Sequence, residues 1–336
     1  MAKNKFAFTI CSNNYLGQAN ALKDSFLRHN KDFQFYIFLV DEFSDAIDYS
    51  IFEPATLILA KDIRGIDFNA LLAKYYIIEL NTNVKASAFK HLISLNPNLE
   101  AIYYLDPDLF FYDSLHAINK VLQDKAMALT PHILTPIARD GKFPDENTFL
   151  QFGVFNLGFI GLSPQHQEAL QMLDWWEHRI LNYGFDRPQK GYFVDQLWMN
   201  FAPIFYDKIE IIKSFGYNMA PWNLHERNIV EHTDDVIKLN DGNDLVFYHF
   251  SKITLDDENI SREFNRFKLS DLPLLKQLYM GYYEALKGSK YEEFKKINIA
   301  YDIKTRTSEL EAKIKPKPKQ NTLEFLLKKV YKALKK

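Results

Sequence analysis

Continuous apolar runs alternate with segments of helical periodicity through the first third of the chain. Residues 5–12, KFAFTICS, and 33–41, FQFYIFLVD, are continuous runs typical of buried strands. Residues 13–30 between them carry apolar side chains near helical spacing, at Leu16, Ala19, Leu22, Phe26 and Leu27. A strand, a helix and a second strand in this order predict parallel strand pairing.

The alternation repeats farther along the chain. Residues 82–97 predict a helix that ends near Pro97, and residues 99–108, LEAIYYLDPD, predict the next strand. The strand hydrophobicity is continuous rather than alternating, which is typical of a sheet covered on both faces. The predicted fold class is therefore α/β, with a Rossmann-like, doubly wound and mostly parallel sheet flanked by helices.

Later segments complete this domain, which we expect to span residues 1–255. Residues 126–133 and 153–163 predict strands, and residues 164–184 predict a long helix with one apolar face. A further strand is predicted at residues 244–251, DLVFYHFS.

Polar, helical and then basic sequence follows. We expect a helical extension at residues 256–312, a linker rich in lysine and proline at 313–321, and a basic amphipathic helix at 322–336. Asn321 and Glu324 form a helix start signal. The last helix either lies on an anionic membrane surface, packs on the body or on a second subunit, or stays disordered.

Composition indicates a globular chain with an acidic body and a basic tail. The 336 residues are 47% hydrophobic, enough for a substantial core. Residues 303–336 hold eleven Lys or Arg against three Asp or Glu, a net charge of +8, so the rest must carry −10 within the total of −2. An acidic body without a basic, aromatic surface makes nucleic acid an unfavoured partner.

The number of cysteines and the lengths of the apolar runs indicate the cellular compartment to expect. Cys11 is the single cysteine, which excludes an intramolecular disulfide and a thiolate metal cluster and suits a reducing cytosol. The first apolar run is too short for the core of a signal peptide, and no stretch approaches the roughly 20 apolar residues of a membrane-spanning helix. We therefore expect a cytoplasmic protein, peripheral on the inner face of the cell membrane if the basic helix binds lipid.

Two carboxylates end the predicted strand at 99–108. Asp106 and Asp108 repel each other unless a cation or hydrogen-bond donors lie between them. Ligands of open α/β sheets bind at the carboxyl ends of strands, so this D-x-D lies where a site is expected. Mn²⁺ or Mg²⁺ is the simplest partner because both prefer oxygen ligands, and a solvated turn around Pro107 is the alternative.

His249 is the candidate for a third metal ligand. It lies in the predicted strand DLVFYHFS, and imidazole joins carboxylates readily around Mn²⁺. The alternative is a hydrogen-bonded core histidine between Tyr248 and Phe250. The other eight histidines show no spacing typical of a metal site.

Five motifs follow one another within residues 6–252. They are the helix, strand and D-x-D of VKASAFKHLISLNPNLEAIYYLDPDLFFYDSL, then FNLGFIGLS, YFVDQLWMN, GYNMAPWNLHER and DLVFYHFS. Together they resemble the metal-dependent bacterial glycosyltransferases of the GT-A fold, in the group related to glycogenin and the lipooligosaccharide galactosyltransferases. The resemblance implies a hexosyltransferase that moves a sugar from a nucleotide-sugar donor to a glycan, a lipid-linked saccharide or a protein, in surface polysaccharide or glycoconjugate assembly.

The resemblance also implies roles at the metal. Asp106, Asp108 and His249 would hold Mn²⁺ or Mg²⁺, and Asp106 would also meet the nucleotide ribose. Lys85 or Lys90 would face the donor phosphates, although a solvated helix face equally explains both lysines.

Catalytic candidates come from two further motifs. The resemblance implies that Asn156, Asp195 and Gln196 line the sugar pocket. From the residues alone, Asn156 also suits a strand end and Asp195 a helix N-cap. In APWNLHER, Trp222 either stacks on a sugar or packs in the core.

Nucleotide contacts would come from the first strand and loop, through Thr9, Cys11, Asn13 and Tyr15. The stretch CSNNY lacks the acidic residue that many relatives have there, and a UDP-sugar is favoured over a GDP-sugar. HFSKITLDD keeps the histidine of the metal motif but lacks the group's glycine and Lys-Pro-Trp, so Lys252 would substitute in the diphosphate clamp.

Three alternatives stay open at this point. The D-Q element favours retention of anomeric configuration, whereas Asp195 or Glu226 as a general base would favour inversion. A haloacid dehalogenase phosphatase also places D-x-D after a strand, but Phe110 stands where that family has Thr or Val. A degenerate, non-catalytic protein that binds nucleotide or glycan at the membrane surface is the non-enzymatic alternative.

Overall fold

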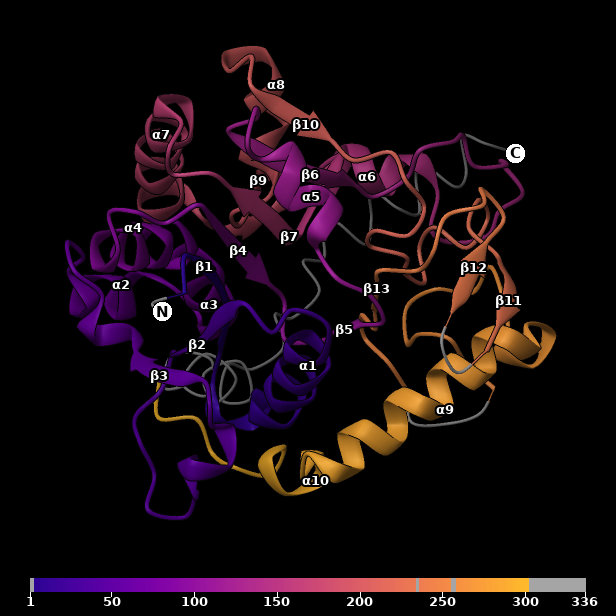
Figure 1. The fold of residues 1–336 in the computed structure, drawn as a ribbon, viewed down its shortest axis with the longest axis horizontal. Coiled ribbons are helices and arrows are strands. Elements are labelled where there is room, and N and C mark those ends of the chain that lie inside the picture. Colours follow the sequence, from indigo (N-terminus) through magenta and orange to yellow (C-terminus); the bar gives the residue numbers. More distant parts are fainter. Residues whose placement is uncertain (1–2, 234–235, 255–257, 302–336) are drawn as a thin grey trace, which may run out of the picture.

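A seven-stranded sheet forms the centre of the protein, for which the computed structural model describes residues 3–233, 236–254 and 258–301. The strand order is β10-β6-β7-β4-β1-β2-β3 (Figure 1). The bounds are β1 (Lys5–Cys11), β2 (Phe33–Leu39), β3 (Thr56–Leu59), β4 (Ala101–Leu105), β6 (Met127–Pro131), β7 (Phe155–Leu162) and β10 (Ile209–Ile211). Neighbouring strands are parallel except where β7 pairs with β4 and β6.

The direction of β7 matters for the site. A parallel strand ends at the carboxyl edge of the sheet, whereas an antiparallel strand begins there. The backbone N–H of Asp106, just past β4, therefore donates to the carbonyl of Gly158 near the start of β7, at 2.7 Å. The predicted mostly parallel α/β sheet is confirmed, but the continuous apolar pattern of residues 153–163 did not indicate the strand's direction.

Helices cover both faces of the sheet (Figure 1). On one face, Phe8 of β1 packs with Phe89 of α4 (Lys85–Leu95) and Trp176 of α7 (Gln167–Tyr183). On the other, Ala7 and Phe26 join the cluster built around α1 (Leu16–His29) and α5 (His116–Val121). Two short helices, α2 (Phe68–Lys74) and α3 (Ile77–Asn83), complete the first face. The prediction of a sheet flanked by helices is thus confirmed.

Short elements extend from the sheet edges. Three antiparallel pairs are β5 (Leu109–Phe111) with β13 (Phe247–His249), β8 (Asp186–Arg187) with β9 (Tyr192–Phe193), and β11 (Ile229–His232) with β12 (Ile237–Leu239). The helices α6 (Glu146–Phe152) and α8 (Ala202–Phe205) lie before β7 and β10.

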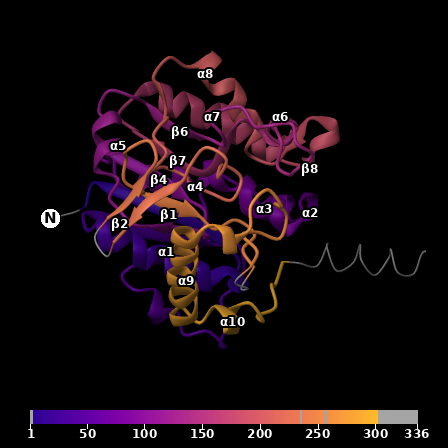
Figure 2. The same ribbon diagram turned by 90° about the vertical axis from the view of Figure 1, so that its right-hand side faces the viewer.

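The chain after β13 returns to the sheet. Helices α9 (Pro273–Gly288) and α10 (Tyr291–Phe294) contact α1, and they run along the α1 side of the molecule (Figures 1 and 2). At Gly17 of α1, the backbone of Tyr291 approaches so closely that an added Cβ would lie 2.6 Å from the Tyr291 Cα. Farther on, the backbone N–H of Ala300 donates to Asp41 after β2, at 2.8 Å. The described part of the extension is therefore packed against the sheet domain.

The remaining predictions for the C-terminal region are untested. The domain boundary at residue 255 stays a prediction, and the linker at 313–321 and basic helix at 322–336 lie outside the described residues. Among the helices that the structure describes, none combines the length and apolar character needed to cross a membrane.

A substitution at Gly17 tests the docking of α10. Gly17→Ala places a methyl group against the Tyr291 backbone, so we expect a loss of about 1–3 kcal/mol in the free energy of unfolding, measured by urea titration. The control is Gly281→Ala in α9, where nothing lies within 4 Å of the new Cβ and helix propensity favours alanine by about 1 kcal/mol. Equal stability of Gly17→Ala and wild type would contradict the close packing.

Candidate metal centre and the adjoining polar pocket

Pairing of two short strands brings the predicted metal ligands together. Asp106 and Asp108 lie in the turn between β4 and β5, and β5 pairs with β13 so that Leu109 faces His249. The backbone N–H of Phe250 also donates to the Asp108 carbonyl at 2.9 Å. A histidine 141 positions from Asp108 in sequence therefore becomes its neighbour in space.

The three side chains present a compact set of ligand atoms. One carboxylate oxygen each from Asp106 and Asp108 and one nitrogen of His249 all lie within 4.8 Å of one another. His249 Nε2 is 3.0 Å from Asp108 Oδ1 and 3.8 Å from Asp106 Oδ2. The histidine is buried and both aspartates are partly exposed. Two hard oxygens and an imidazole nitrogen open to one side suit Mn²⁺ or Mg²⁺ with space for further oxygen ligands.

Electrostatics in this cluster favour a cation. Burial raises the pKa of the Asp106 carboxyl, and the charge of Asp108 adds to that rise, while Lys85 and His249 act in the opposite direction. Burial lowers the pKa of His249, but the nearby carboxylates of Asp108 and Asp106 outweigh it and leave a net rise. Tyr104 donates from its hydroxyl to Asp106 Oδ1 at 2.5 Å. The carboxylates are thus held close together at an unfavourable separation, which a bound dication relieves.

Gly158 leaves the room that this cluster needs. A Cβ at position 158 would lie 2.6 Å from His249 Cε1 and 2.8 Å from both Asp106 Oδ2 and the Asn156 side-chain oxygen. No L side chain fits between these groups without displacing at least one of them. Gly158, the first glycine of the FNLGFIGLS motif, is therefore required by the side chains of the site rather than by the strand.

A buried ion pair lies beside the metal cluster. Lys85 Nζ pairs with Asp195 and donates to the carbonyl of Leu157 at 3.0 Å, and both charged side chains are almost completely buried. The same ammonium lies 3.9 Å from the centre of the Tyr104 ring. Lys85 thus connects Asp195 to the tyrosine that binds Asp106, and its positive charge acts on the Asp106 carboxyl.

The backbone around Asp195 is strained and tightly held. Val194 has a φ of +35°, a conformation that is a clear outlier for a β-branched residue. The indole of Trp176 donates to the Asp195 carbonyl at 2.9 Å. The Gln196 amide accepts from the N–H of Leu157 at 3.0 Å and donates to the carbonyl of Phe152 at 2.9 Å. Gln196 therefore ties the segment carrying Asp195 to the start of β7.

Asn156 lies at the junction of these groups. Its side-chain oxygen accepts from the N–H of Gly158 at 3.1 Å, and its side-chain nitrogen contacts His132 Nε2 at 3.2 Å. The amide nitrogen is a donor only, so Nε2 of His132 acts as the acceptor and the imidazole is neutral. Burial, followed by the charge of His249, lowers the pKa of His132 to about 3, in agreement with that assignment.

Lys90 and Lys252, which were predicted to face the donor phosphates, pair with carboxylates outside the metal cluster. Lys90 pairs with Asp174 at 2.9 Å and Glu177 at 2.5 Å, both on α7. Lys252 has a φ of +52° and pairs with Glu263. The structure brings Lys85 to the cluster and does not bring Lys90 there.

Of the residues predicted to contact the nucleotide, some are buried in the core and Tyr15 is exposed near the metal cluster. The Cys11 thiol is buried in the core cluster beneath α1, and Thr9 is buried in mid-strand. Tyr15 is 45% exposed and close enough to Asp108 that, after burial, the aspartate charge raises the pKa of its hydroxyl. The backbone N–H of Asn13 donates to Asp41 Oδ2 at 3.1 Å. The Tyr15 hydroxyl is thus within reach of the charge of a candidate metal ligand.

Sequence reasoning missed several residues that shape the site. Asp41 after β2 receives N–H groups from Asn13 and Ala300, and Asn218 contacts both Asn156 and His249. Asp41 had a visible signal, since it is a carboxylate at the end of a predicted strand. Asn218 stands in the quoted motif GYNMAPWNLHER, but nothing in its spacing indicated its partners.

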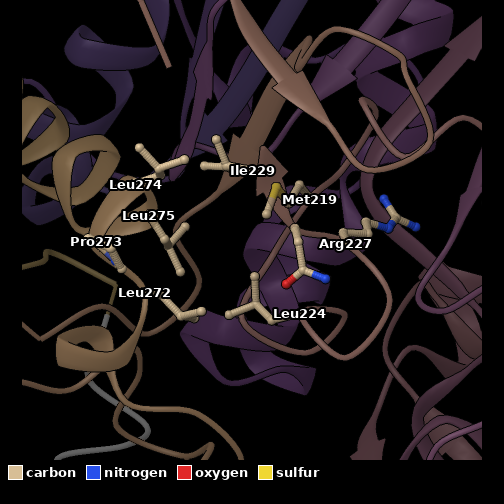
Figure 3. Close-up of a pocket in the computed structure, with 9 residues that line it drawn as sticks. Met219, Leu224, Arg227, Ile229, Leu272, Pro273, Leu274 and Leu275 are labelled. Atoms are coloured by element: carbon tan, nitrogen blue, oxygen red, sulfur yellow. The ribbon is translucent and has the colours of Figure 1, made fainter. Parts of the chain in front are cut away.

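The loop that follows Asn218 is fixed by a buried ion pair and borders a small cavity. Arg227 donates to Glu226 Oε1 at 3.2 Å and to the carbonyl of Tyr217 at 2.6 Å. A cavity of about 210 Å³ lies behind this loop, lined mainly by Met219, Leu224, Ile229 and Leu272–Leu275 (Figure 3). The Arg227 guanidinium points away from the leucines of α9 (Figure 3). None of the predicted site residues lines this cavity.

Trp222 has a packing role in this structure. It is 4% exposed, and its ring lies edge-on to His249 and to His132, with centroids 5.0 Å and 5.4 Å apart. Of the two alternatives for this residue, the structure favours core packing. Trp222 forms the apolar wall between the metal-facing histidine and the histidine that holds Asn156.

The sequence comparisons assign no activity to this chain. No protein-family model matches the chain. Two Bacillus subtilis (strain 168) proteins are similar to it. The uncharacterized protein YfnF is 27% identical over 278 residues, 81% of this chain and 89% of its own. The uncharacterized protein YfnD is 26% identical over 286 residues, 83% of this chain and 88% of its own.

Two solved structures of glycosyltransferases are among those similar to this chain. The galactosyltransferase LgtC, in complex with donor and acceptor sugar analogs, has a TM-score of 0.45 and 14% identity, covering 84% of this chain and 95% of its own. The glycosyltransferase GlyE of Streptococcus pneumoniae TIGR4 has a TM-score of 0.46 and 14% identity, covering 89% of this chain and 67% of its own. At these values the neighbours assign no activity to this chain.

A substitution at Gly158 tests the cluster. Gly158→Ala inserts a methyl group among His249, Asn156 and Asp106, so we expect Mn²⁺ affinity, measured by isothermal titration calorimetry, to fall at least tenfold. The control on the same strand is Gly161→Ala, whose Cβ would meet the Tyr103 ring at 2.6 Å. This control should lose stability but keep Mn²⁺ affinity. Unchanged affinity in Gly158→Ala would contradict the assignment of the ligands.

His132 predicts a defined acid sensitivity. Its pKa is about 3 when folded, against 6.5 for a free histidine, so the unfolded chain binds the proton first as the pH falls. This contribution to stability is complete above about pH 6.5 and declines by about 1.4 kcal/mol per pH unit toward pH 3. We expect His132→Gln to show a shallower loss of stability than wild type between pH 7 and 5 in urea titrations. His116→Gln, at an exposed position, is the control, and equal slopes for all three proteins would contradict the prediction.

Proposed function

We propose that the protein is a metal-dependent glycosyltransferase that moves a sugar from a nucleotide-sugar donor to a glycan, a lipid-linked saccharide or a protein. The observation that carries this proposal is the convergence of Asp106, Asp108 and His249 within 4.8 Å at the carboxyl edge of a mostly parallel sheet. That edge is where open α/β sheets bind their ligands. The five sequence motifs that resemble GT-A glycosyltransferases supply the reaction class.

The metal cluster and its neighbours suit a nucleoside diphosphate leaving group. Asp106, Asp108 and His249 would hold Mn²⁺ or Mg²⁺, which supplies positive charge for the departing diphosphate. Tyr104 positions the Asp106 carboxylate from the protein side. Tyr15 lies on the exposed side near Asp108, where a bound nucleotide would meet an aromatic ring.

The polar residues next to the metal cluster suit the donor sugar. Asn156, Asp195 and Gln196 come from β7 and the segment after β9, and backbone N–H groups of β7 donate to the side-chain oxygens of Gln196 and Asn156. Fixed amides and a fixed carboxylate can orient sugar hydroxyls without reorganising when the substrate binds. The side-chain oxygen and nitrogen of Gln196 both form hydrogen bonds within the protein. Its proposed role is therefore to hold the segment that carries Asp195 against β7.

The carboxylate environments support retention of anomeric configuration. Asp195 is paired with buried Lys85, so its carboxylate is already engaged within the protein. Glu226 accepts from the backbone N–H groups of Leu134 and Thr135 and pairs with Arg227, so it is also engaged. An inverting transferase needs a free general base, whereas a retaining one can act chiefly by stabilising the leaving group.

The finer points of the proposal come from the sequence. A UDP-sugar is the favoured donor and a GDP-sugar the alternative, and surface polysaccharide or glycoconjugate assembly is the proposed setting. A cytoplasmic location, with the basic helix at 322–336 on an anionic membrane surface, belongs to the same proposal.

Donor binding and hydrolysis test the proposal. With Mn²⁺ present, one donor of a nucleotide-sugar panel should stabilise the protein by about 2.7 kcal/mol at 100 times its Kd and be hydrolysed slowly. The variant Asp108→Asn should lose both effects because it removes a metal ligand. Asp113→Asn, an exposed aspartate after the same turn, is the control and should keep them.

Two results would count against the proposal in different ways. If no nucleotide or nucleotide sugar shifts the melting temperature in the presence of Mn²⁺, the donor site is wrong. If a donor binds and neither hydrolysis nor transfer occurs with any acceptor tested, the protein is the non-catalytic binding protein named as the alternative.

A further inference from the structure

We infer that Asn218 is a positioning residue that keeps a proton on His249 Nδ1, so that Nε2 is the nitrogen available to a metal held by Asp106 and Asp108. The inference deepens the proposed function and rests on its metal site. Asn218 is completely buried and touches His249, Asn156 and Thr130 through its amide.

The orientation of the amide follows from a backbone donor. The N–H of Gly158 donates to Asn156 Oδ1 at 3.1 Å, which fixes that atom as the oxygen. Asn156 Oδ1 also accepts from Asn218 Nδ2 at 3.1 Å, so the atom of Asn218 that faces Asn156 is the nitrogen. The same nitrogen donates to Thr130 Oγ1 at 3.0 Å. Asn218 therefore presents its oxygen on the opposite side.

That oxygen determines the state of His249. Asn218 Oδ1 lies 3.2 Å from His249 Nδ1 and can only accept, so Nδ1 carries the proton. With Nδ1 protonated, Nε2 is the nitrogen that lies 3.0 Å from Asp108 Oδ1 and 3.8 Å from Asp106 Oδ2, and it would offer its lone pair to a dication there in place of any proton shared with the carboxylates. A backbone N–H thus fixes which nitrogen of a metal-facing histidine keeps its proton, through two asparagine side chains.

The backbone around Asn218 is built to keep it in place. Asn218 has a φ of +59°, the left-handed conformation that asparagine tolerates better than most residues. Its carbonyl accepts from the Asn223 amide at 3.0 Å, and Arg227 holds the preceding carbonyl of Tyr217 at 2.6 Å. The next carbonyl, of Met219, accepts the backbone N–H of His249 at 2.8 Å. Met219 faces the cavity behind the loop (Figure 3).

Two substitutions separate orientation from packing. Asn218→Gly removes the side chain without straining the left-handed backbone, so it deletes the acceptor for His249 Nδ1. Asn218→Asp keeps an acceptor opposite Nδ1 but replaces the donor to Asn156 and Thr130 with a charged oxygen, and carboxylates commonly serve as such partners of metal-bound histidines. The control is Asn30→Gly, a buried asparagine at the end of α1 that accepts from the N–H of Leu115 and lies outside the site.

Mn²⁺ affinity and the histidine tautomer are the measurements. We expect Asn218→Gly to lose about 10- to 100-fold in Mn²⁺ affinity by isothermal titration calorimetry, while Asn218→Asp and Asn30→Gly stay within about threefold of wild type. In metal-free wild type, nitrogen NMR of labelled histidine should show His249 Nδ1 protonated, whether or not Nε2 also shares a proton with Asp108. The NMR measurement needs no variant to fold.

Failure of this inference differs from failure of the proposed function. Wild-type affinity in Asn218→Gly, an equal loss in Asn218→Gly and Asn218→Asp, or an unprotonated His249 Nδ1 in wild type would each overturn the role of Asn218 while leaving the metal site intact. A wild-type protein that binds no Mn²⁺ at all would overturn the metal site and the positioning role together.

Discussion

The pairing of β5 with β13 is the contact on which the rest of the site depends. It sets His249 opposite Leu109 and so beside Asp106 and Asp108, which stand half-buried at the edge of the sheet. Two like charges in such a place cost free energy unless a cation lies between them. The fold therefore holds two carboxylates at its carboxyl edge in an arrangement that a bound cation stabilises. The oxygen and imidazole ligand atoms determine which cations suit the site.

A positive charge inside the protein also acts on this cluster. Lys85 pairs with Asp195 and lies against the Tyr104 ring, and its charge favours the ionised form of Asp106. Because the ion pair is buried, removing either partner would leave an uncompensated charge in the core. The pair thus links Asp195 to the metal cluster, and a disturbance at Asp195 would reach Asp106 through Lys85 and Tyr104.

Uncommon backbone conformations and a glycine occur where the side chains of the site are most crowded. Gly158 has no side chain because His249, Asn156 and Asp106 already fill the space around its Cα, and Asn218 adopts a left-handed conformation that directs its amide inward. Val194, at a φ of +35°, takes strain immediately before Asp195. Strain of about 1–3 kcal/mol persists only where the surroundings determine the conformation. Here those surroundings include the Trp176 indole, which holds the Asp195 carbonyl.

The sequence by itself determined the fold class and the metal candidates. Continuous apolar runs and helical spacing record burial on each element, so they predicted strands at residues 5–12, 33–41 and 99–108 and the covered, mostly parallel sheet. Asp106 and Asp108 were visible because two charges at the end of an apolar run are unusual there. The resemblance to the GT-A family pointed to Lys85 and Lys90 equally, since both lie on one predicted helix.

Only the tertiary structure decided which of these candidates meet. Lys85 faces the cluster and Lys90 faces α7, a difference of one and a half helical turns that periodicity alone cannot assign to a partner. His249 and Asn218 reach the site through strand pairing and a loop fixed from 215 to 227, contacts that join residues more than 60 positions apart. Local pattern encodes burial and element type, whereas the choice of partner depends on long-range packing that no short stretch of sequence contains.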